Sequence, residues 1–110
     1  MILDKDAILS KRGDMHREEF EVPELGGSIF IRIMTLKEVE DVRKVQRANT
    51  DVLRVYPRLI SLACVDENGE QLFSPSDSQA ISELPWPALD RIATAILKLN
   101  KMTGDTDPKD

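Results

Sequence analysis

The stretch EFEVPELGGSIFIRIMT, residues 19–35, decides the fold because its apolar residues alternate with polar ones on both sides of a glycine pair. The apolar members of this alternation are Phe20, Val22, Ile29, Ile31 and Ile33. A period of two is the spacing of a β-strand with one buried face. Leu25-Gly26-Gly27 then predicts the turn of a β-hairpin, which needs a residue with positive φ. Pro23 cannot donate to a sheet ladder, so the first strand is an edge strand or ends there.

A glycine pair is also typical of loops that bind phosphate, because residues without a Cβ let backbone amides approach an anion closely. A dinucleotide site needs the sequence G-x-G-x-x-G leading from a strand into a helix. Here the glycines lead into a second strand. The pattern therefore favours a hairpin turn over an anion-binding loop.

A helix is predicted directly after the hairpin, because Thr35 and Glu38 have the spacing of a capping box. The apolar residues of this helix recur at a strict spacing of three, at Leu36, Val39, Val42 and Val45. Since an α-helix turns every 3.6 residues, such a row winds around the helix. Two interpretations follow: the row faces the core of one domain, or its two ends contact two bodies, one of them another chain.

Residues 52–65, VLRVYPRLISLACV, fit a buried helix, although Pro57 clashes with the carbonyl group four residues earlier in a regular helix. The sequence predicts either a kink at Pro57 or a helix that starts there, after a separate turn at residues 52–56. Cys64 lies in an apolar run without a nearby base, so a buried and unreactive thiol is predicted.

Residues 66–73, DENGEQLF, place acids around a glycine, as calcium-binding loops do. An EF-hand loop needs glycine at its sixth position, whereas Gly69 is the fourth residue counted from Asp66. The spacing therefore does not fit calcium. A turn through Asn68 and Gly69 is predicted instead, and we expect it to return Leu72 and Phe73 to the core.

Two helices are predicted in the last third of the chain. Ser74 is expected to cap a helix that has Pro75 at its first position. This short helix is expected to face inward with Ala80, Ile81 and Leu84. A longer helix is predicted from Pro87 to Met102, with Gly104 as its stop.

The apolar stripe of the closing helix, with Trp86 at its entry, is wider than a single packing surface requires. Two interpretations follow: this is the central helix of the core, or it shares a face with a partner. If a partner binds here, the candidate partner-binding residues are Trp86, Leu89, Ile92, Ile96 and Leu99.

Composition excludes several classes of partner. The chain has 110 residues, with 20 acids against 15 bases, and a formal net charge of −5. A field of this sign repels phosphate backbones and anionic lipids, so neither nucleic acid nor a membrane is expected to bind. No apolar run approaches the roughly 20 residues that cross a bilayer, and the N-terminus lacks the pattern of a secretory signal. With a single cysteine, the expected location is the cytoplasm.

Catalysis, a metal site and a cofactor are not predicted. Nucleophilic catalysis needs a serine, threonine or cysteine beside a base, but the one histidine, His16, lies in the polar segment KRGDMHREE. Cys64 and His16 alone cannot build a zinc site. The carboxylates lie in solvated runs or in first turns of helices, where nothing raises their pKa. The sequence therefore predicts a protein that binds through its surface.

The predicted fold is a single small α+β domain, in which an N-terminal β-hairpin packs on a bundle of about three to five helices. Residues 1–19 are expected to form a short helix, capped by Asp4, and a polar linker. Residues 20–103 form the α+β domain, and residues 104–110 form a flexible acidic tail.

The order of these pieces resembles the tail assembly chaperones of long-tailed bacteriophages and prophages. The resemblance covers nearly the whole chain and is carried best by VPELGG at residues 22–27 and by CVDENGEQLF at residues 64–73. It implies a chaperone that coats the tape-measure protein, helps to recruit tail-tube subunits in the cytoplasm of the bacterial host, and is absent from the mature virion. It also implies a homo-oligomer as one possible state, and a slippery run of codons for a frameshift near Pro108-Lys109.

A function of another class fits the same composition. A small acidic regulatory protein, such as an inhibitor or an antitoxin-like module, also binds another protein through its surface. Gene neighbourhood separates the two: a tube gene upstream and a very long helical gene downstream favour the chaperone, whereas an adjacent toxin or enzyme gene favours the regulator.

Overall fold

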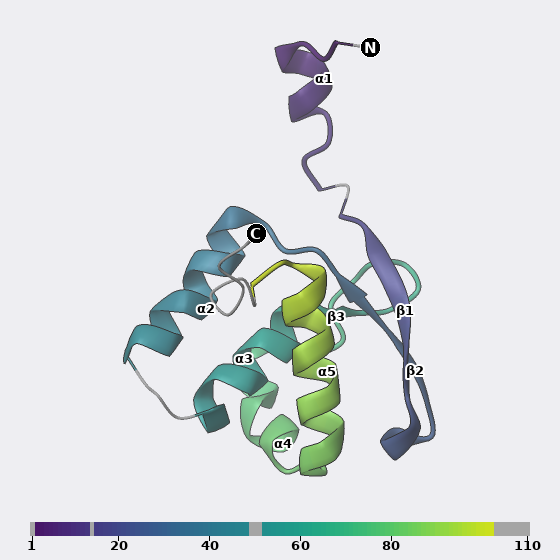
Figure 1. Ribbon diagram of the computed structural model, residues 1–110, viewed down its shortest axis with the longest axis vertical. Coiled ribbons are helices and arrows are strands. Elements are labelled where there is room, and N and C mark those ends of the chain that lie inside the picture. The colour runs from purple at the N-terminus through teal and green to yellow at the C-terminus, as the bar shows by residue number, and fades with distance from the viewer. Residues whose placement is uncertain (1, 14, 49–51, 103–110) are drawn as a thin grey trace, which may run out of the picture.

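The computed structural model describes residues 2–13, 15–48 and 52–102, and it has the predicted α+β architecture (Figure 1). Two predictions, the flexible tail at residues 104–110 and the frameshift near Pro108-Lys109, fall on residues outside these ranges. The strands are β1 (Arg17–Val22), β2 (Gly27–Arg32) and β3 (Cys64–Val65). The helices are α1 (Lys5–Leu9), α2 (Leu36–Ala48), α3 (Val52–Ala63), α4 (Ser78–Ser82) and α5 (Trp86–Leu99), with 3₁₀ turns η1 (Pro23–Leu25) and η2 (Pro75–Asp77).

The hairpin of β1 and β2 confirms the prediction from the alternating stretch. The strands are antiparallel, with Phe20 opposite Ile29, and Gly26 has the positive φ of 77° that the turn needs. Both expectations for Pro23 hold, because β1 ends just before it and is an edge strand in the order β1-β2-β3. Strand β1 begins at Arg17, earlier than the pattern suggested, so it takes in part of the predicted polar linker.

The third strand is a departure from the prediction for residues 52–65. Helix α3 ends at Ala63, and the last two residues of that segment pair with Phe30 and Ile31 of β2 as strand β3. Residues 52–63 form one helix with Pro57 inside it, so the interpretation with a separate turn before Pro57 is wrong. The thiol of Cys64 is buried, as predicted, and its burial raises its pKa to about 12.

The capping box at the start of α2 is confirmed, and it is joined to a buried arginine. The hydroxyl of Thr35 accepts a hydrogen bond from the Glu38 amide at 3.2 Å, and the Glu38 carboxylate accepts one from the Thr35 amide at 2.9 Å. The same carboxylate receives two hydrogen bonds from the Arg32 guanidinium at 3.0 and 2.8 Å. Burial alone raises the pKa of Glu38, but the bonds from Arg32 and Thr35 outweigh it, and the pKa lies below its ordinary value of 4.5.

Replacement of Glu38 by glutamine is expected to lower the free energy of unfolding by about 2 kcal/mol at neutral pH, because it leaves the buried Arg32 charge without its counter-ion. The lowered pKa means that Glu38 stabilises the fold above pH 4.5 and that this contribution is lost as the pH falls through its folded-state value. The difference between the two proteins should therefore shrink in acid. Urea unfolding across this pH range measures it.

The control for that experiment is Glu40→Gln, on the same helix. Glu40 is half-exposed and lies 3.8 Å from Arg47, also half-exposed. An exposed pair of this kind contributes little, so this variant should stay within about 0.5 kcal/mol of the natural protein at every pH. Equal losses for the two variants would contradict the role assigned to Glu38.

The core lies between the helices and one face of the hairpin. Helix α5 packs against α3 on one side and against the hairpin on the other, as Figure 1 shows. The fully buried large side chains are Leu59, Ile60, Ile81, Ile96, Val22, Val42, Val65 and Cys64. They come from sheet and helices alike, so the hairpin and the bundle share one core.

Two inward-facing predictions were wrong in part. Phe73 packs against the core, but its neighbour Leu72, which lies in a bend of the chain, is exposed. Ile81 of α4 is buried, and Leu84, two residues past the end of this helix, packs against the core, whereas Ala80 is exposed. Neighbouring residues of a helix point in different directions, so Ile81 and Ala80 do not share its inward face.

A single side chain joins the end of α5 to the end of β2. The amide oxygen of Asn100 accepts a hydrogen bond from the Met34 backbone N–H at 2.7 Å. Its amide nitrogen donates to the carbonyl oxygens of Arg32 at 3.3 Å and of Ile96 at 3.0 Å. The segment between the sheet and α2 is thereby held on the last helix.

Helix α1 is set apart from this core. It is capped by Asp4, as predicted, whose carboxylate accepts a hydrogen bond from the Ala7 amide at 2.8 Å. No residue of α1 is buried, and Figure 1 shows the helix standing beyond the end of β1 that is opposite to the hairpin turn. We refer to residues 2–13 as the arm.

Candidate functional site

The structure separates the candidate partner-binding residues of the closing helix into two groups. Leu89, Ile92 and Ile96 are buried in the core, so the interpretation of α5 as a central helix accounts for them and they are not available on the surface of the folded domain. Leu99 is half-buried against the same core. Trp86 is 52% exposed and lies at the start of the helix. Of these five residues, Trp86 is the one that a partner can reach directly.

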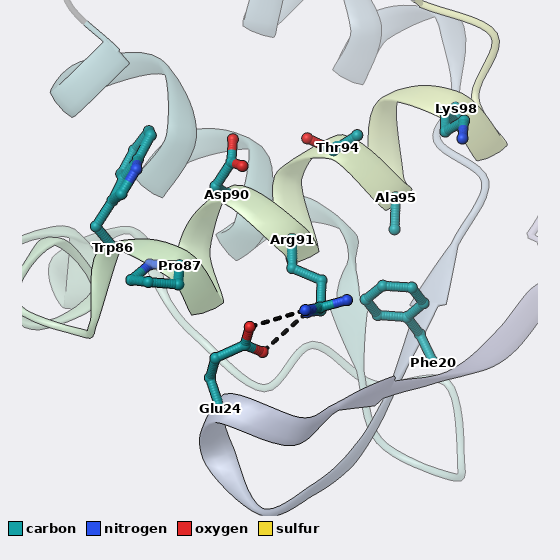
Figure 2. A pocket seen from close by; sticks show the side chains of 9 residues that line it. All are labelled: Phe20, Glu24, Trp86, Pro87, Asp90, Arg91, Thr94, Ala95 and Lys98. Carbon is teal, nitrogen blue, oxygen red and sulfur yellow. Dashed lines mark hydrogen bonds and ion pairs between the residues drawn. The ribbon is translucent and has the colours of Figure 1, made fainter.

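Trp86 stands at one end of a groove that runs along α5 and is bordered on one side by the hairpin, with a volume of about 520 Å³ (Figure 2). Apolar and charged side chains line it together: Phe20, Glu24, Trp86, Pro87, Asp90, Arg91, Thr94, Ala95 and Lys98. We call this the α5 groove.

Helical spacing explains why these residues share one groove. Residues four apart lie above one another on a helix, and α5 contributes two such rows. Figure 2 shows one row that points away from the hairpin, made of Trp86, Asp90, Thr94 and Lys98. The other row, Pro87, Arg91 and Ala95, points toward the hairpin, where it meets Phe20 and Glu24.

Trp86 is held in position by an aromatic partner on α3. Its ring is stacked on that of Tyr56, with centroids 5.7 Å apart and planes 3° from parallel. Burial raises the pKa of the Tyr56 phenol, and the nearby Asp90 carboxylate raises it further. The tryptophan is therefore a pre-positioned apolar surface, since stacking fixes one face of the ring while much of the residue remains exposed.

An ion pair fixes the hairpin wall of the groove. The Arg91 guanidinium donates to both carboxylate oxygens of Glu24, through Nε at 2.8 Å and Nη2 at 2.9 Å. The bonds from Arg91 hold the pKa of Glu24 below its ordinary value. A bidentate pair of this kind fixes orientation as well as distance, so the turn of the hairpin is oriented on α5.

The chemistry of the α5 groove suits the docking of another protein segment. Its apolar side chains offer burial, and Asp90 and Lys98 form no ion pair within the described residues.

His16 lies outside the groove and hydrogen-bonds to Glu18 at 3.1 Å. In the described part of the chain, no three histidine, cysteine or acidic side chains are placed to hold a metal ion.

The first residue of α2 is another exposed apolar side chain. In the row with a spacing of three, Val42 is buried, Val39 and Val45 pack against the core, and Leu36 is 77% exposed. The core-facing interpretation therefore holds for the three valines. Leu36 is the end of the row that the core does not cover.

The sequence pattern pointed to the apolar stripe of α5, whereas the α5 groove lies along its polar residues. The groove residues Asp90, Arg91, Thr94 and Lys98 are the polar residues that alternate with the buried stripe. A signal was present, because Trp86 is in line with Asp90, Thr94 and Lys98 at intervals of four. The hairpin wall with Phe20 and Glu24 had no such signal, since it depends on a contact between segments far apart in sequence.

No protein-family description and no curated protein sequence matches the chain. Among solved structures, the fold is similar to that of the tail assembly chaperone of bacteriophage HK97, with a TM-score of 0.62 and 16% sequence identity. The match covers 86% of this chain and 94% of that one. The predicted resemblance to tail assembly chaperones thus has a structural counterpart in the fold. In residues 2–13, 15–48 and 52–102, no helix is long and apolar enough to cross a membrane.

Proposed function

We propose that this protein is a phage tail assembly chaperone, which binds the tape-measure protein and helps to recruit tail-tube subunits during tail morphogenesis in the host cytoplasm, and which is absent from the mature virion. The observation that carries the proposal is the similarity of fold to the HK97 tail assembly chaperone over most of both chains. The fold by itself does not specify a function.

The α5 groove has the properties that a helical client requires. Amphipathic helices bind by placing apolar side chains, three and four residues apart, into an apolar groove. Trp86 offers an aromatic anchor at one end, and Phe20 and Ala95 offer apolar surface further along. Aromatic anchors of this kind concentrate the energy of an interface. The formal net charge of −5 keeps a protein with such a surface soluble.

The test is co-expression with the tape-measure protein, the proposed client. We expect the client to remain soluble and to be recovered with the chaperone by affinity purification, and to aggregate when it is expressed alone. A second purification with the tail-tube protein added should recover all three. As a control, a globular protein of the same size as the client should not be recovered.

Two outcomes would overturn the proposal. Aggregation of the client to the same extent with and without this protein would exclude a chaperone. Recovery of a host enzyme or a toxin, with no binding to the client, would favour the small acidic regulatory protein instead.

A further inference from the structure

A second cavity, with a volume of about 260 Å³, lies on the face of the sheet that points away from the core. Arg17 is on this face because Val22, at the opposite parity of β1, is fully buried. The described residues that line the cavity include Gly13 at the end of the arm, Arg17 and Arg32 of the hairpin, and Asn68, Gly69 and Gln71 of the loop after β3. None of the described lining residues is acidic, although the chain has 20 acids.

The two arginines of the cavity are direct partners across the hairpin. Arg17 of β1 lies opposite Arg32 of β2 in the register of the strands. Like charges at opposed positions destabilise a sheet, because the Cβ atoms are only about 4.5–5.5 Å apart. Arg32 has Glu38 as its counter-ion at 2.8 Å. Arg17 forms no ion pair with any carboxylate in the described ranges, so its positive charge is left for a ligand to neutralise.

The guanidinium of Arg17 is held in place although the residue is exposed. Its Nη2 donates a hydrogen bond to the carbonyl oxygen of Glu67 at 2.6 Å, and its central carbon lies 5.6 Å from the centroid of the Phe30 ring. Nη1 lies beside Gly69, 3.5 Å from the position where a Cβ would be. Within the part of the chain that the structure describes, Nε and Nη1 have no acceptor, so a fixed pair of donors is available.

Asp66, the acid that most directly senses Arg17, is occupied by its own loop. Its Oδ1 accepts hydrogen bonds from the backbone amides of Glu70 at 3.0 Å and of Asn68 at 2.8 Å. These bonds lower the pKa of Asp66 more than the charge on Arg17 does. The carboxylate therefore shapes the loop that borders the cavity.

We propose that this cavity binds a phosphate group, as free phosphate or as a small phosphate monoester. Arginine binds phosphate through parallel N–H···O bonds. A phosphate group has three acceptor oxygens, so it can take bonds from Arg17 on the strand and from the side-chain amide of Asn68 on the loop.

The size of the cavity and the charge of the chain restrict the ligand. Pockets for drug-sized molecules have about 300–1,000 Å³, so a cavity of about 260 Å³ takes a smaller molecule. The formal net charge of −5 repels a polyanion such as nucleic acid at long range, whereas a single phosphate group meets mainly the local charge. Phosphate binding here needs no client and is tested on this chain alone, so its failure would leave the proposed function untouched.

The experiment is an NMR titration of the full chain with sodium phosphate and, separately, with glycerol phosphate. Sodium chloride at the same ionic strength is the reference. We expect saturable shifts of the Gly69 backbone amide and of the Arg17 Nε–H, and no comparable shifts along α5. Tighter binding of glycerol phosphate would identify a monoester as the ligand, and equal binding would identify the phosphate group alone.

Variants of Arg17 separate a phosphate site from a general effect of salt. Arg17→Gln should weaken phosphate binding at least about tenfold, because it removes charged hydrogen bonds. Arg17→Lys keeps the charge but loses the planar fork, so it should weaken binding about threefold. The matched control is Arg47→Gln, which makes the same change of net charge at an exposed residue of α2 outside the cavity. It should bind phosphate as the natural protein does.

Asn68→Ala is a second test, because Arg17 also supports the loop through Glu67. Asn68 is exposed, and its replacement should leave the fold intact by circular dichroism and weaken binding about threefold. Four results would overturn the proposal: shifts of Gly69 that chloride reproduces, unchanged binding by a folded Arg17→Gln protein, unchanged binding by Asn68→Ala, or tighter binding of acetate than of phosphate.

Discussion

Replacement of Ile96 by alanine is expected to lower the free energy of unfolding by about 4 kcal/mol. Ile96 is fully buried on the central helix, where truncation removes apolar burial and leaves a cavity. A domain of this size has about 5–15 kcal/mol of stability in total, so the loss is a large part of it. Urea unfolding followed by circular dichroism measures the change.

The control is Leu36→Ala, at the exposed end of the row on α2. It removes a side chain of similar volume from the surface, so the expected change is within about 0.5 kcal/mol. The two variants also show whether Ile96 belongs to the core or to an interface with the client. If Ile96→Ala left stability unchanged but reduced binding of the client, the residue would be part of an interface and its assignment to the core would be wrong.

Replacement of Trp86 by alanine is expected to weaken binding of the tape-measure protein about 100-fold, or by about 3 kcal/mol. The reason is that Trp86 is the exposed aromatic anchor of the α5 groove, held in place by Tyr56. The loss of stacking should lower the free energy of unfolding by only about 1 kcal/mol. Recovery of the client after co-expression, and titration with a purified client segment, measure the effect.

Leu36→Ala serves again as the control for this experiment, because it removes an exposed apolar side chain outside the groove. It should bind the client as the natural protein does. If Trp86→Ala also bound normally while remaining folded, the α5 groove would not be the client site. The proposed function would then need another surface of the domain.

The elements that the sequence predicted well are those fixed by local chemistry. The hairpin follows from alternation around Gly26, and the start of α2 follows from the reciprocal bonds of Thr35 and Glu38. Strand β3 has only two residues and exists because β2 pairs with it. Such a strand has no pattern of its own. Pro57 left two local alternatives open, and in the structure the helix continues through it.

The candidate site was predictable only in part, for a physical reason. Hydrophobic periodicity identifies which face of α5 is apolar, but it does not say whether the domain or a partner covers that face. For Leu89, Ile92 and Ile96 the domain covers it. The α5 groove depends on where the hairpin lies, and the bond between Arg91 and Glu24 spans 67 residues. A feature of that kind appears only when the chain is folded.

The contact of Asn100 with Met34 has a consequence for the time course of synthesis. The two residues are 66 positions apart, and a ribosome adds about 5–20 residues per second, so the amide of Met34 waits roughly 3–13 s for its partner. Ile96 and the rest of α5 are also synthesised long after the hairpin, and until then the hairpin lacks the helix that packs against it. The domain therefore completes its fold only after α5 has been synthesised. The protein that we propose to guard another chain against aggregation passes through its own vulnerable interval first.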